Sequence, residues 1–565
     1  MTKKGKHKAS VLLTTVCRPF GGEAEGISVG AELFHAQITR AQGPFSLRQT
    51  IRCWGLDYIA ENIESPAMTL HYPSEDELVQ ELAARSWDYV GINFVVATFH
   101  KMKAVVALVR KYQPNAQIVL GGYGTVLSDE QLQPFANHIC RQEGVAYMRR
   151  LLGEDVERPI EHPYVPIDSP NVYSYQLPSY VAHVTAGLGC PNGCDFCCTS
   201  HFFNRQYVPF LGTGKALHSE IIRQEKEAKR RGDELSGFII IDEDFFMQEG
   251  RAREYLDCVR QGGHAPSLMG FGSVAGLSKF TADEIAEMGF HTIWTAFEGK
   301  RSGYAKLNGK PLPQLHEEMR VRGIALLCSM IIGLPYQDQE TILAEFAEQQ
   351  ALKPCYTQIL IQFAFPRTPL YESVLNKGLY LPQFAENPDY RKFDGFSLHF
   401  KHEHFSPAEL EALQLELYDR DFKELGPSLV RINRTFFEGW KNLRDSEKPL
   451  LQERAQRQKE YVERSVPGLY PAIYLGPSEK ARKDASLLLQ EVKKELGSIS
   501  LLQRVKGWAA VGLALWSKLC LKMDWFQQPK LIRTEHRLQD LHGQLAREKK
   551  ERPLRKDLLP KSTKV

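Results

Sequence analysis

The sequence predicts the α/β fold class in three parts: a doubly wound parallel sheet over residues 1–165, a partial β/α barrel over 166–400 and a mainly helical region over 401–565. Strand-like and helix-like segments alternate through the first two parts, and such alternation builds parallel sheets covered by helices. Beyond Ser406 the sequence becomes helical in its apolar spacing and rich in charge. A chain of 565 residues also exceeds the size of one hydrophobic core, which favours several domains.

The first part contains short apolar runs separated by amphipathic segments. The predicted strands are Val11–Val16, Ala67–Tyr72, Tyr89–Val96 and Gln117–Leu120, and the predicted helices are Ser74–Ala84, Lys101–Tyr112 and Ser128–Phe135. A Rossmann-like sheet of this kind binds its ligand at the carboxyl ends of the strands. The residues that follow these strands are therefore candidate ligand contacts.

A proline-rich segment over residues 161–178 is the expected linker to the second part. Longer strand–helix repeats follow it. The predicted strands are His183–Gly187, Gly237–Asp242, Ser267–Gly272, Thr292–Glu298, Ala325–Pro335 and Thr357–Phe365. They indicate a partial (β/α)6 barrel of the TIM type, in which ligand-binding residues gather at the carboxyl face.

Charge and cysteine content exclude several classes of protein. The 71 basic and 68 acidic residues give a net charge of +3, too even to steer nucleic acid onto one face, so no nucleic-acid partner is expected. The 11 cysteines are spread along the chain except at residues 190–198, a pattern of ligands rather than disulfides, which predicts a reducing cytoplasm. No apolar stretch reaches the length of about 18 residues expected of a membrane-spanning helix.

The motif with the most chemical content is Gly187-Leu-Gly-Cys190-Pro-Asn-Gly-Cys194-Asp-Phe-Cys197, which has CxxxCxxC spacing after a predicted strand. Soft thiolates favour iron–sulfur clusters or zinc. Clusters that only transfer electrons usually have four cysteine ligands, whereas three leave one iron open. A structural zinc site is the alternative, and Cys198 and His201 are close enough in sequence to supply its fourth ligand.

The motif, with the aromatic Phe196 before its last cysteine, resembles that of the radical S-adenosylmethionine (SAM) superfamily. Four later segments resemble further elements of that family, in the same order: Gly237–Phe246 the second barrel strand of members with a cobalamin-binding domain, Met288–Gly299 the fourth, Arg322–Pro335 the fifth, and Phe365–Tyr371 the P-x-T-P-L-Y segment. The resemblance covers roughly residues 185–380. It implies that Cys190, Cys194 and Cys197 bind a [4Fe-4S] cluster whose open iron binds SAM.

The same resemblance implies a set of SAM-binding residues, namely Phe196, Asp242, Glu298 and Gly333. For Asp242 and its acidic neighbours Glu243 and Asp244, a solvated strand end is the alternative. Glu298 follows four apolar or small residues, and a carboxylate there is costly to bury unless it meets a partner. No catalytic acid or base is assigned.

A doubly wound domain before the barrel resembles the cobalamin-binding domain of one class of this family. The candidate cobalamin contacts are Asn93, Gly121, Gly122, Thr125 and, near the cobalt face, Arg18. The pattern DxHxxG, which supplies a cobalt ligand in some cobalamin proteins, is absent after the first strand, where the sequence reads CRPFGG. Cobalamin without a protein ligand to cobalt is expected, and a domain that kept its fold but lost its ligand is the alternative.

The resemblance implies a cobalamin-dependent methyltransferase that acts on an unactivated carbon of a small-molecule or lipid substrate, with an electron donor such as flavodoxin or ferredoxin. A radical SAM enzyme that forms rings, rearranges its substrate or joins carbons is one alternative. A non-catalytic metal-binding scaffold is another.

The apolar segment Val505–Leu521 is too short to span a bilayer. It would either pack in a core or lie on a membrane surface with its tryptophans at headgroup level. We expect core packing, with peripheral membrane contact as the alternative.

Overall fold

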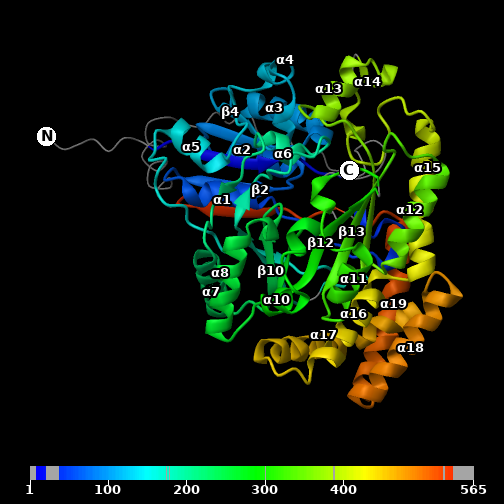
Figure 1. Ribbon diagram of the computed structural model, residues 1–565. Coiled ribbons are helices and arrows are strands. Elements are labelled where there is room, and N and C mark those ends of the chain that lie inside the picture. Colours follow the sequence, from blue (N-terminus) through cyan, green and yellow to red (C-terminus); the bar gives the residue numbers. More distant parts are fainter. Residues whose placement is uncertain are drawn as a thin grey trace.

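The computed structural model describes residues 8–20, 37–173, 175–176, 178–299, 301–385, 388–525 and 528–538. Figure 1 shows the amino-terminal sheet in blue above the green barrel, with the yellow and orange helices of the carboxyl-terminal region along the barrel's other side. The α/β fold class and the order of its parts are as the sequence predicts.

The first sheet has the strand order β15-β2-β1-β3-β4-β5. Its strands are β1 (Val11–Thr15), β2 (Ala67–His71), β3 (Tyr89–Asn93), β4 (Gln117–Gly121), β5 (His138–Ile139) and β15 (Ile532–His536). The first five pair in parallel, which confirms the predicted doubly wound sheet. The chain reverses its direction of winding at β1, so β1 and β3 border the point where such sheets bind ligands.

Helices cover both faces of this sheet: α1 (Trp54–Asn62), α2 (Glu75–Ala84), α3 (Phe99–Tyr112), α4 (Asp129–Leu132) and α5 (Gly144–Leu152). Helix α2 begins at the predicted position because Ser74 and Glu77 cap each other. The Glu77 amide donates to Ser74 Oγ at 3.2 Å and the Ser74 amide donates to the Glu77 carboxylate at 2.8 Å.

Strand β15 comes from the far end of the chain and pairs antiparallel with β2. The sequence analysis places its residues in a mainly helical region. Its short run Ile532–His536 alternates between half-buried and exposed side chains and closes the β2 edge, which would otherwise present unpaired backbone groups. The carboxyl-terminal region therefore also completes the first sheet.

The second sheet is an open barrel with the strand order β14-β13-β12-β11-β10-β7-β6. Its parallel strands are β7 (Tyr180–Thr185), β10 (Leu235–Ile241), β11 (Leu268–Phe271), β12 (Phe290–Glu298), β13 (Ala325–Ile332) and β14 (Tyr356–Ile361). They overlap the predicted strands. Strand β6 (Pro166–Asp168), from the predicted linker, adds to β7 in the antiparallel direction.

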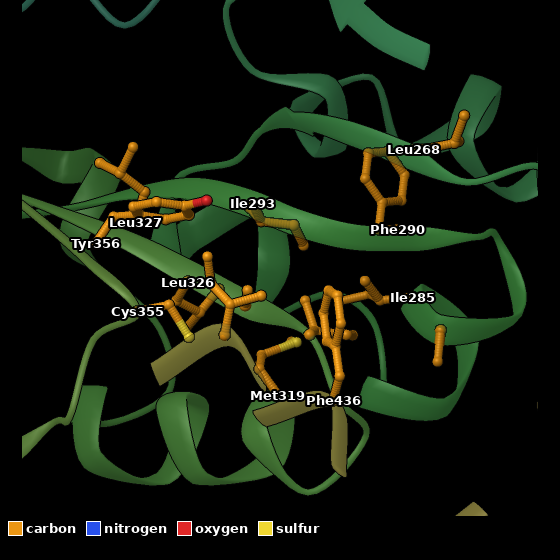
Figure 2. Close-up of a cluster of buried hydrophobic side chains, with 14 of the residues drawn as sticks. Leu268, Ile285, Phe290, Ile293, Met319, Leu326, Leu327, Cys355, Tyr356 and Phe436 are labelled. Atoms are coloured by element: carbon orange, nitrogen blue, oxygen red, sulfur yellow. The ribbon is translucent and has the colours of Figure 1, made fainter. Parts of the chain in front are cut away.

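The outer face of the barrel packs against helices between its strands and against the carboxyl-terminal region. The helices between strands are α7 (Gly214–Arg231), α8 (Glu249–Gly262), α10 (Ala282–Glu287), α11 (Leu312–Arg320) and α12 (Gln339–Ala351). Figure 2 shows Phe436 of α16 (Ser428–Leu443) beside Met319 of α11, below the strand residues Ile293 and Leu326. A second apolar cluster runs from the first sheet through Phe393 and Phe396 into the barrel, so the two sheets share a core.

The carboxyl-terminal region consists of α15 (Pro407–Leu425), α16, α17 (Pro449–Leu475), α18 (Glu479–Leu496) and α19 (Leu501–Lys522), followed by β15. These five helices confirm the mainly helical character predicted for residues 401–565. Helix α19 contains the apolar segment that we expected to pack in a core, but large apolar side chains on one of its faces are exposed. None of the described helices is both long and apolar enough to cross a membrane.

His264 links the barrel to α17 and predicts a pH dependence of stability. Its Nε2 lies 3.1 Å from Glu225 on α7 and its Nδ1 lies 3.2 Å from Glu453 on α17. Hydrogen bonds to Glu225, and then to Glu453, raise the pKa of His264 to about 9. Because the folded-state pKa exceeds the ordinary value of 6.5, this stabilisation is complete below that value and is lost as the pH rises through about 9.

We therefore expect His264→Gln to lower the melting temperature at about pH 6 and to have little effect at about pH 10. The ring is 42% exposed, which limits the change in unfolding free energy to about 1 kcal/mol. Thermal unfolding of both proteins across this pH range measures the effect. A penalty of equal size at both ends would contradict the assignment.

Candidate active site

The cysteine motif forms a curled loop between β8 (Gly187–Leu188) and α6 (Cys198–Phe202). Ser200 Oγ donates to the Cys190 carbonyl at 2.6 Å and accepts from the Gly193 amide at 3.0 Å. The Cys197 amide donates to the Cys194 carbonyl at 3.0 Å. Gly193 has φ +66°, and a Cβ there would meet the Arg205 guanidinium. The backbone thus fixes the loop around its three cysteines.

The three thiols lie close enough to interact through their charges. Burial, and then the charge of the Cys197 thiolate, raises the pKa of Cys190 to about 11, against a backbone hydrogen bond from Asn192 that lowers it. Burial also raises the pKa of Cys194 and of Cys197. All 11 cysteines are unpaired. Thiols of this kind remain protonated until a metal binds and displaces the proton, and three thiolates are soft ligands that suit an iron–sulfur cluster or zinc.

Among the described residues, no group of three or more His, Cys, Asp or Glu side chains is arranged to hold a single metal ion. The two residues that could supply a fourth zinc ligand have other contacts. His201 Nε2 lies 3.0 Å from the Cys194 carbonyl, and Cys198 packs against an apolar cluster.

Two predicted SAM contacts, Phe196 and Glu298, meet beside the cysteine loop. Glu298 forms a buried ion pair with Lys306, whose Nζ lies 5.3 Å from the centre of the Phe196 ring. The Tyr304 ring packs edge-on against Phe196 at 5.2 Å, and its hydroxyl donates to Asp195 at 2.8 Å. The sequence analysis missed Lys306 and Tyr304 because they belong to a single 3-10 turn, η7 (Ala305–Leu307) with Tyr304 as its N-cap, which is too short to show periodicity and carries no motif.

Glu298 reaches Lys306 through an unusual backbone conformation. Its φ is +54°, and the pairing of β12 with β13 shifts register between Ala296 and Glu298. A non-glycine residue in this region costs on the order of 1–3 kcal/mol, and such residues concentrate at functional sites. The bulge directs the carboxylate toward the cysteine loop.

The acidic run after β10 is not a solvated strand end. Asp242 is 3% exposed, forms an ion pair with Arg251 and accepts from the Tyr207 hydroxyl at 3.0 Å. Asp244 is also buried and accepts from the Ser273 amide at 3.2 Å. The solvated strand end is therefore wrong for Asp242 and Asp244. The SAM contact at Asp242 stays a prediction, and this carboxylate already has two partners, Arg251 and Tyr207.

Glu243, between these two residues, is different. It makes no hydrogen bond or ion pair with any described residue. Burial, and then the charge of Asp242, raises the pKa of Glu243 to about 7. Its charge acts on Cys197 and on Tyr123 of the first sheet. Glu243 is thus an acidic side chain with free hydrogen-bonding capacity near the cysteine loop, and Asp244 beside it has one buried carboxylate oxygen without a hydrogen bond.

Gly333 packs against α15, and the segment Phe365–Tyr371 contacts the cysteine loop. Gly333 ends β13 with φ +80°, and a Cβ there would lie 2.8 Å from the Leu410 side chain of α15. Thr368 caps α13 (Pro369–Asn376), and the Leu370 amide donates to the Asp195 carbonyl at 3.1 Å. The second contact ties this segment directly to the cysteine loop.

The predicted cobalamin contacts Asn93, Gly121, Gly122 and Thr125 lie together at the carboxyl edge of the first sheet. Asn93 Nδ2 donates to Cys53 Sγ at 2.9 Å, and the buried Thr125 hydroxyl donates to the Gly122 carbonyl at 2.8 Å. No heavy atom beyond its chain neighbours lies within 4 Å of a Cβ built at Gly121. The backbone at Gly121 is therefore open to a ligand.

Arg18, the remaining predicted contact, is already engaged. Its guanidinium donates to the Tyr72 carbonyl at 2.7 Å and to Glu77 at 2.9 Å. These bonds hold it at the start of α2. An approach to a cobalt ion would require both of them to break.

The two candidate sites meet through Tyr123, in the loop after β4. Its ring packs edge-on against Phe202 of α6 at 5.1 Å, and its side chain hydrogen-bonds to Thr199. Helix α6 begins directly after Cys197. A ligand at the carboxyl edge of the first sheet would therefore lie next to the cysteine loop.

The barrel interior combines aromatic and amide groups. The Phe271 and Trp294 rings stack with centres 5.4 Å apart. Trp294 Nε1 donates to Ser329 Oγ at 2.5 Å, Ser329 donates to Gln358 at 2.7 Å, and Gln358 donates to Gln37 at 2.8 Å. This chain of hydrogen bonds crosses the interior from β12 to the segment that precedes the barrel.

The comparisons with known proteins agree with this architecture. No family model and no curated protein matches the chain. A solved structure of the radical SAM methyltransferase TsrM from Kitasatospora setae, with tryptophan substrate and the SAM analogue aza-SAM bound, matches with a TM-score of 0.51 and 16% identity. The match covers 77% of this chain and 89% of that one. This chain has the fold of a radical SAM methyltransferase.

A second structure of TsrM, with cobalamin and a [4Fe-4S] cluster bound, matches with a TM-score of 0.49 and 14% identity over 80% of this chain and 100% of that one. At these identities the likeness concerns the fold. The match with a TM-score of 0.51 confirms the predicted architecture, a doubly wound domain followed by an open barrel. The assignments of individual site residues stay predictions.

The carboxyl edge of the first sheet predicts a strong glycine requirement at position 122. Gly122 has φ +85°, and a Cβ there would lie 2.5 Å from Asn93 Oδ1 and 2.7 Å from the Phe94 carbonyl oxygen. Gly153, with φ +70° and no atom within 4 Å, is the matched control. We expect Gly122→Ala to lower the unfolding free energy by about 2 kcal/mol more than Gly153→Ala, because overpacking adds to backbone strain. Urea unfolding of both variants measures the difference, and equal losses would contradict it.

The Glu298–Lys306 pair predicts a coupled effect on stability. Lys306→Met leaves a carboxylate with a side-chain exposure of 6% without its partner, which should cost about 3–5 kcal/mol. Adding Glu298→Gln should restore part of that loss, since the buried charge is then removed. Chemical denaturation of the two single variants and the double variant gives the coupling energy. Strictly additive losses would show that the two side chains do not depend on each other.

Proposed function

We propose that this chain is a radical SAM enzyme that holds a [4Fe-4S] cluster with Cys190, Cys194 and Cys197, and that it is a cobalamin-dependent methyltransferase acting on an unactivated carbon. The observation that supports it is the contact of Tyr123 with α6, which brings the carboxyl edge of the first sheet against the cysteine loop. TsrM, whose fold the chain shares, is a radical SAM methyltransferase that binds a SAM analogue. When bound, the cluster supplies the electron for SAM cleavage and cobalamin supplies a methyl carrier.

The residues around the loop match what SAM requires. The amino-acid end of SAM carries one ammonium and one carboxylate group. Lys306 and Glu298 offer one charge of each sign beside Cys194, and Phe196 offers an aromatic face next to them. Glu298 is buried and Lys306 is half-buried, so their interactions with a bound ligand are stronger than they would be in water.

The first sheet supplies the second cofactor site in this proposal. The open backbone at Gly121 and the left-handed turn at Gly122 allow a large ligand to approach the ends of β3 and β4 closely. The pattern DxHxxG is absent directly after β1, where the sequence reads CRPFGG, and Arg18 is held by Tyr72 and Glu77. The proposal therefore has cobalamin bound without a protein ligand to cobalt.

The first test is the cofactor content and SAM chemistry of the protein purified without oxygen from cells supplied with cobalamin. We expect about four irons per chain, with matching sulfide, and loss of both in Cys190→Ala, Cys194→Ala and Cys197→Ala. Cys198→Ala is the matched control because its thiol packs against apolar side chains, and it should retain the cluster. Wild-type iron content in any of the three variants would contradict the ligand assignment.

The products formed from SAM distinguish methyl transfer from the other radical reactions. A methyltransferase converts its methyl-donor SAM to S-adenosylhomocysteine, whereas a ring-forming or rearranging enzyme produces 5'-deoxyadenosine without it. Cobalt analysis of the same preparation tests the second cofactor. Cobalt-free protein that cleaves SAM would support the degenerate-domain alternative, and protein that binds iron but never cleaves SAM would favour a metal-binding scaffold.

A further inference from the structure

Helix α19 has an unusual distribution of side chains. Its buried positions are small residues, Gly507, Ala514, Ser517 and Cys520. Seven of its exposed positions are large and apolar, with exposed fractions between 43% and 78%: Leu501, Leu502, Val505, Trp508, Leu515, Trp516 and Leu519. Surface helices of soluble proteins normally show the reverse.

The exposed side chains form one stripe on a helix that is firmly anchored on its other side. Positions 501, 505, 508, 515 and 519 are separated by three, four or seven residues, which places them on a single helical face. On the opposite face, a Cβ at Gly507 would lie 2.6 Å from the Tyr470 ring of α17. Helix α19 therefore cannot rotate to bury the stripe without losing this close packing.

Aromatic and basic residues accompany the stripe. Trp508 stacks on Tyr474 of α17 with ring centres 4.9 Å apart, and Tyr474 is itself 51% exposed. Arg504, Lys506, Lys518 and Lys522 on the same helix are all exposed. The helix contains no acidic residue between Leu501 and Lys522.

We propose that this face of α19 binds the surface of an anionic lipid membrane, with the helix lying in the plane of the interface. Large apolar side chains enter the acyl boundary, tryptophans lie at headgroup level, and lysines pair with anionic headgroups. A second copy of the chain fits less well. It would bring the basic residues of two such helices together with no acidic side chain on either helix to pair with them.

This inference does not rest on the proposed radical chemistry. The stripe belongs to α19, on the side of the barrel away from the first sheet, and none of the cysteine-loop residues contributes to it (Figure 1). Membrane binding can therefore be measured on protein without cluster, SAM or cobalamin. Its failure would leave the proposed function untouched, and the converse also holds.

The test is flotation of the full chain with vesicles of phosphatidylcholine alone or mixed with phosphatidylglycerol, at low and high salt. We expect binding to the anionic vesicles that weakens with salt. Leu515→Glu should weaken it at least about tenfold, because a charge enters the apolar boundary. Leu415→Glu on α15 is the matched control, since Leu415 is 50% exposed and Leu515 is 52% exposed.

Basic residues give a second variant that leaves the apolar face intact. Lys518→Gln and Lys522→Gln should each weaken binding to anionic vesicles roughly fivefold, whereas the exposed Lys494→Gln on α18 should not. Circular dichroism and thermal unfolding establish that each variant is folded.

Three results would overturn the proposal. One is a full chain that stays unbound at every lipid composition. Another is self-association that Leu515→Glu abolishes, which would assign the face to a second copy. The third is a chain ending at Leu538 that binds vesicles when the full chain does not, which would assign the face to residues 539–565.

Discussion

The contact between Tyr123 and α6 determines how the carboxyl edges of the two sheets lie relative to each other. Parallel sheets bind ligands at the carboxyl ends of their strands, and here both carboxyl edges face one another because the loop after β4 packs against the helix that follows Cys197. The shared apolar cluster around Phe393 and Phe396 makes this arrangement part of the core rather than a loose docking of domains. A ligand bound at one edge would therefore lie next to a ligand bound at the other.

The acidic side chains around the cysteine loop differ in whether they have a basic partner. Asp242 and Glu298 are each buried beside a basic partner, Arg251 and Lys306. Glu243 has no such partner among the described residues, and its raised pKa reflects the cost of placing a carboxylate in that position. Carboxylates with a strongly raised pKa and no basic partner concentrate at functional sites.

Much of this architecture is predictable because its signals are local. Apolar periodicity predicts the strands and helices, and the spacing of the cysteines alone predicts the cysteine loop. The rest depends on contacts that periodicity does not encode. Sequence analysis chose Asp242 as a SAM contact from three neighbouring acidic residues. Only the fold shows that Asp242 pairs with Arg251 and that Glu243 has no basic partner among the described residues. Lys306 lies in a turn, and β15 is a short charged run whose partner strand is more than 400 residues away in the chain.

Helix α19 shows why apolar content is an incomplete guide to burial. The residues Val505–Leu521 are apolar enough to suggest a core helix, yet the packed face needs small side chains to approach α17 closely, so the large ones face outward. Exposing so many large apolar side chains costs solubility, and a soluble monomer rarely carries such a patch without a binding partner. The anchored side and the exposed side thus have one explanation: the fold holds α19 in place so that its outer face remains available.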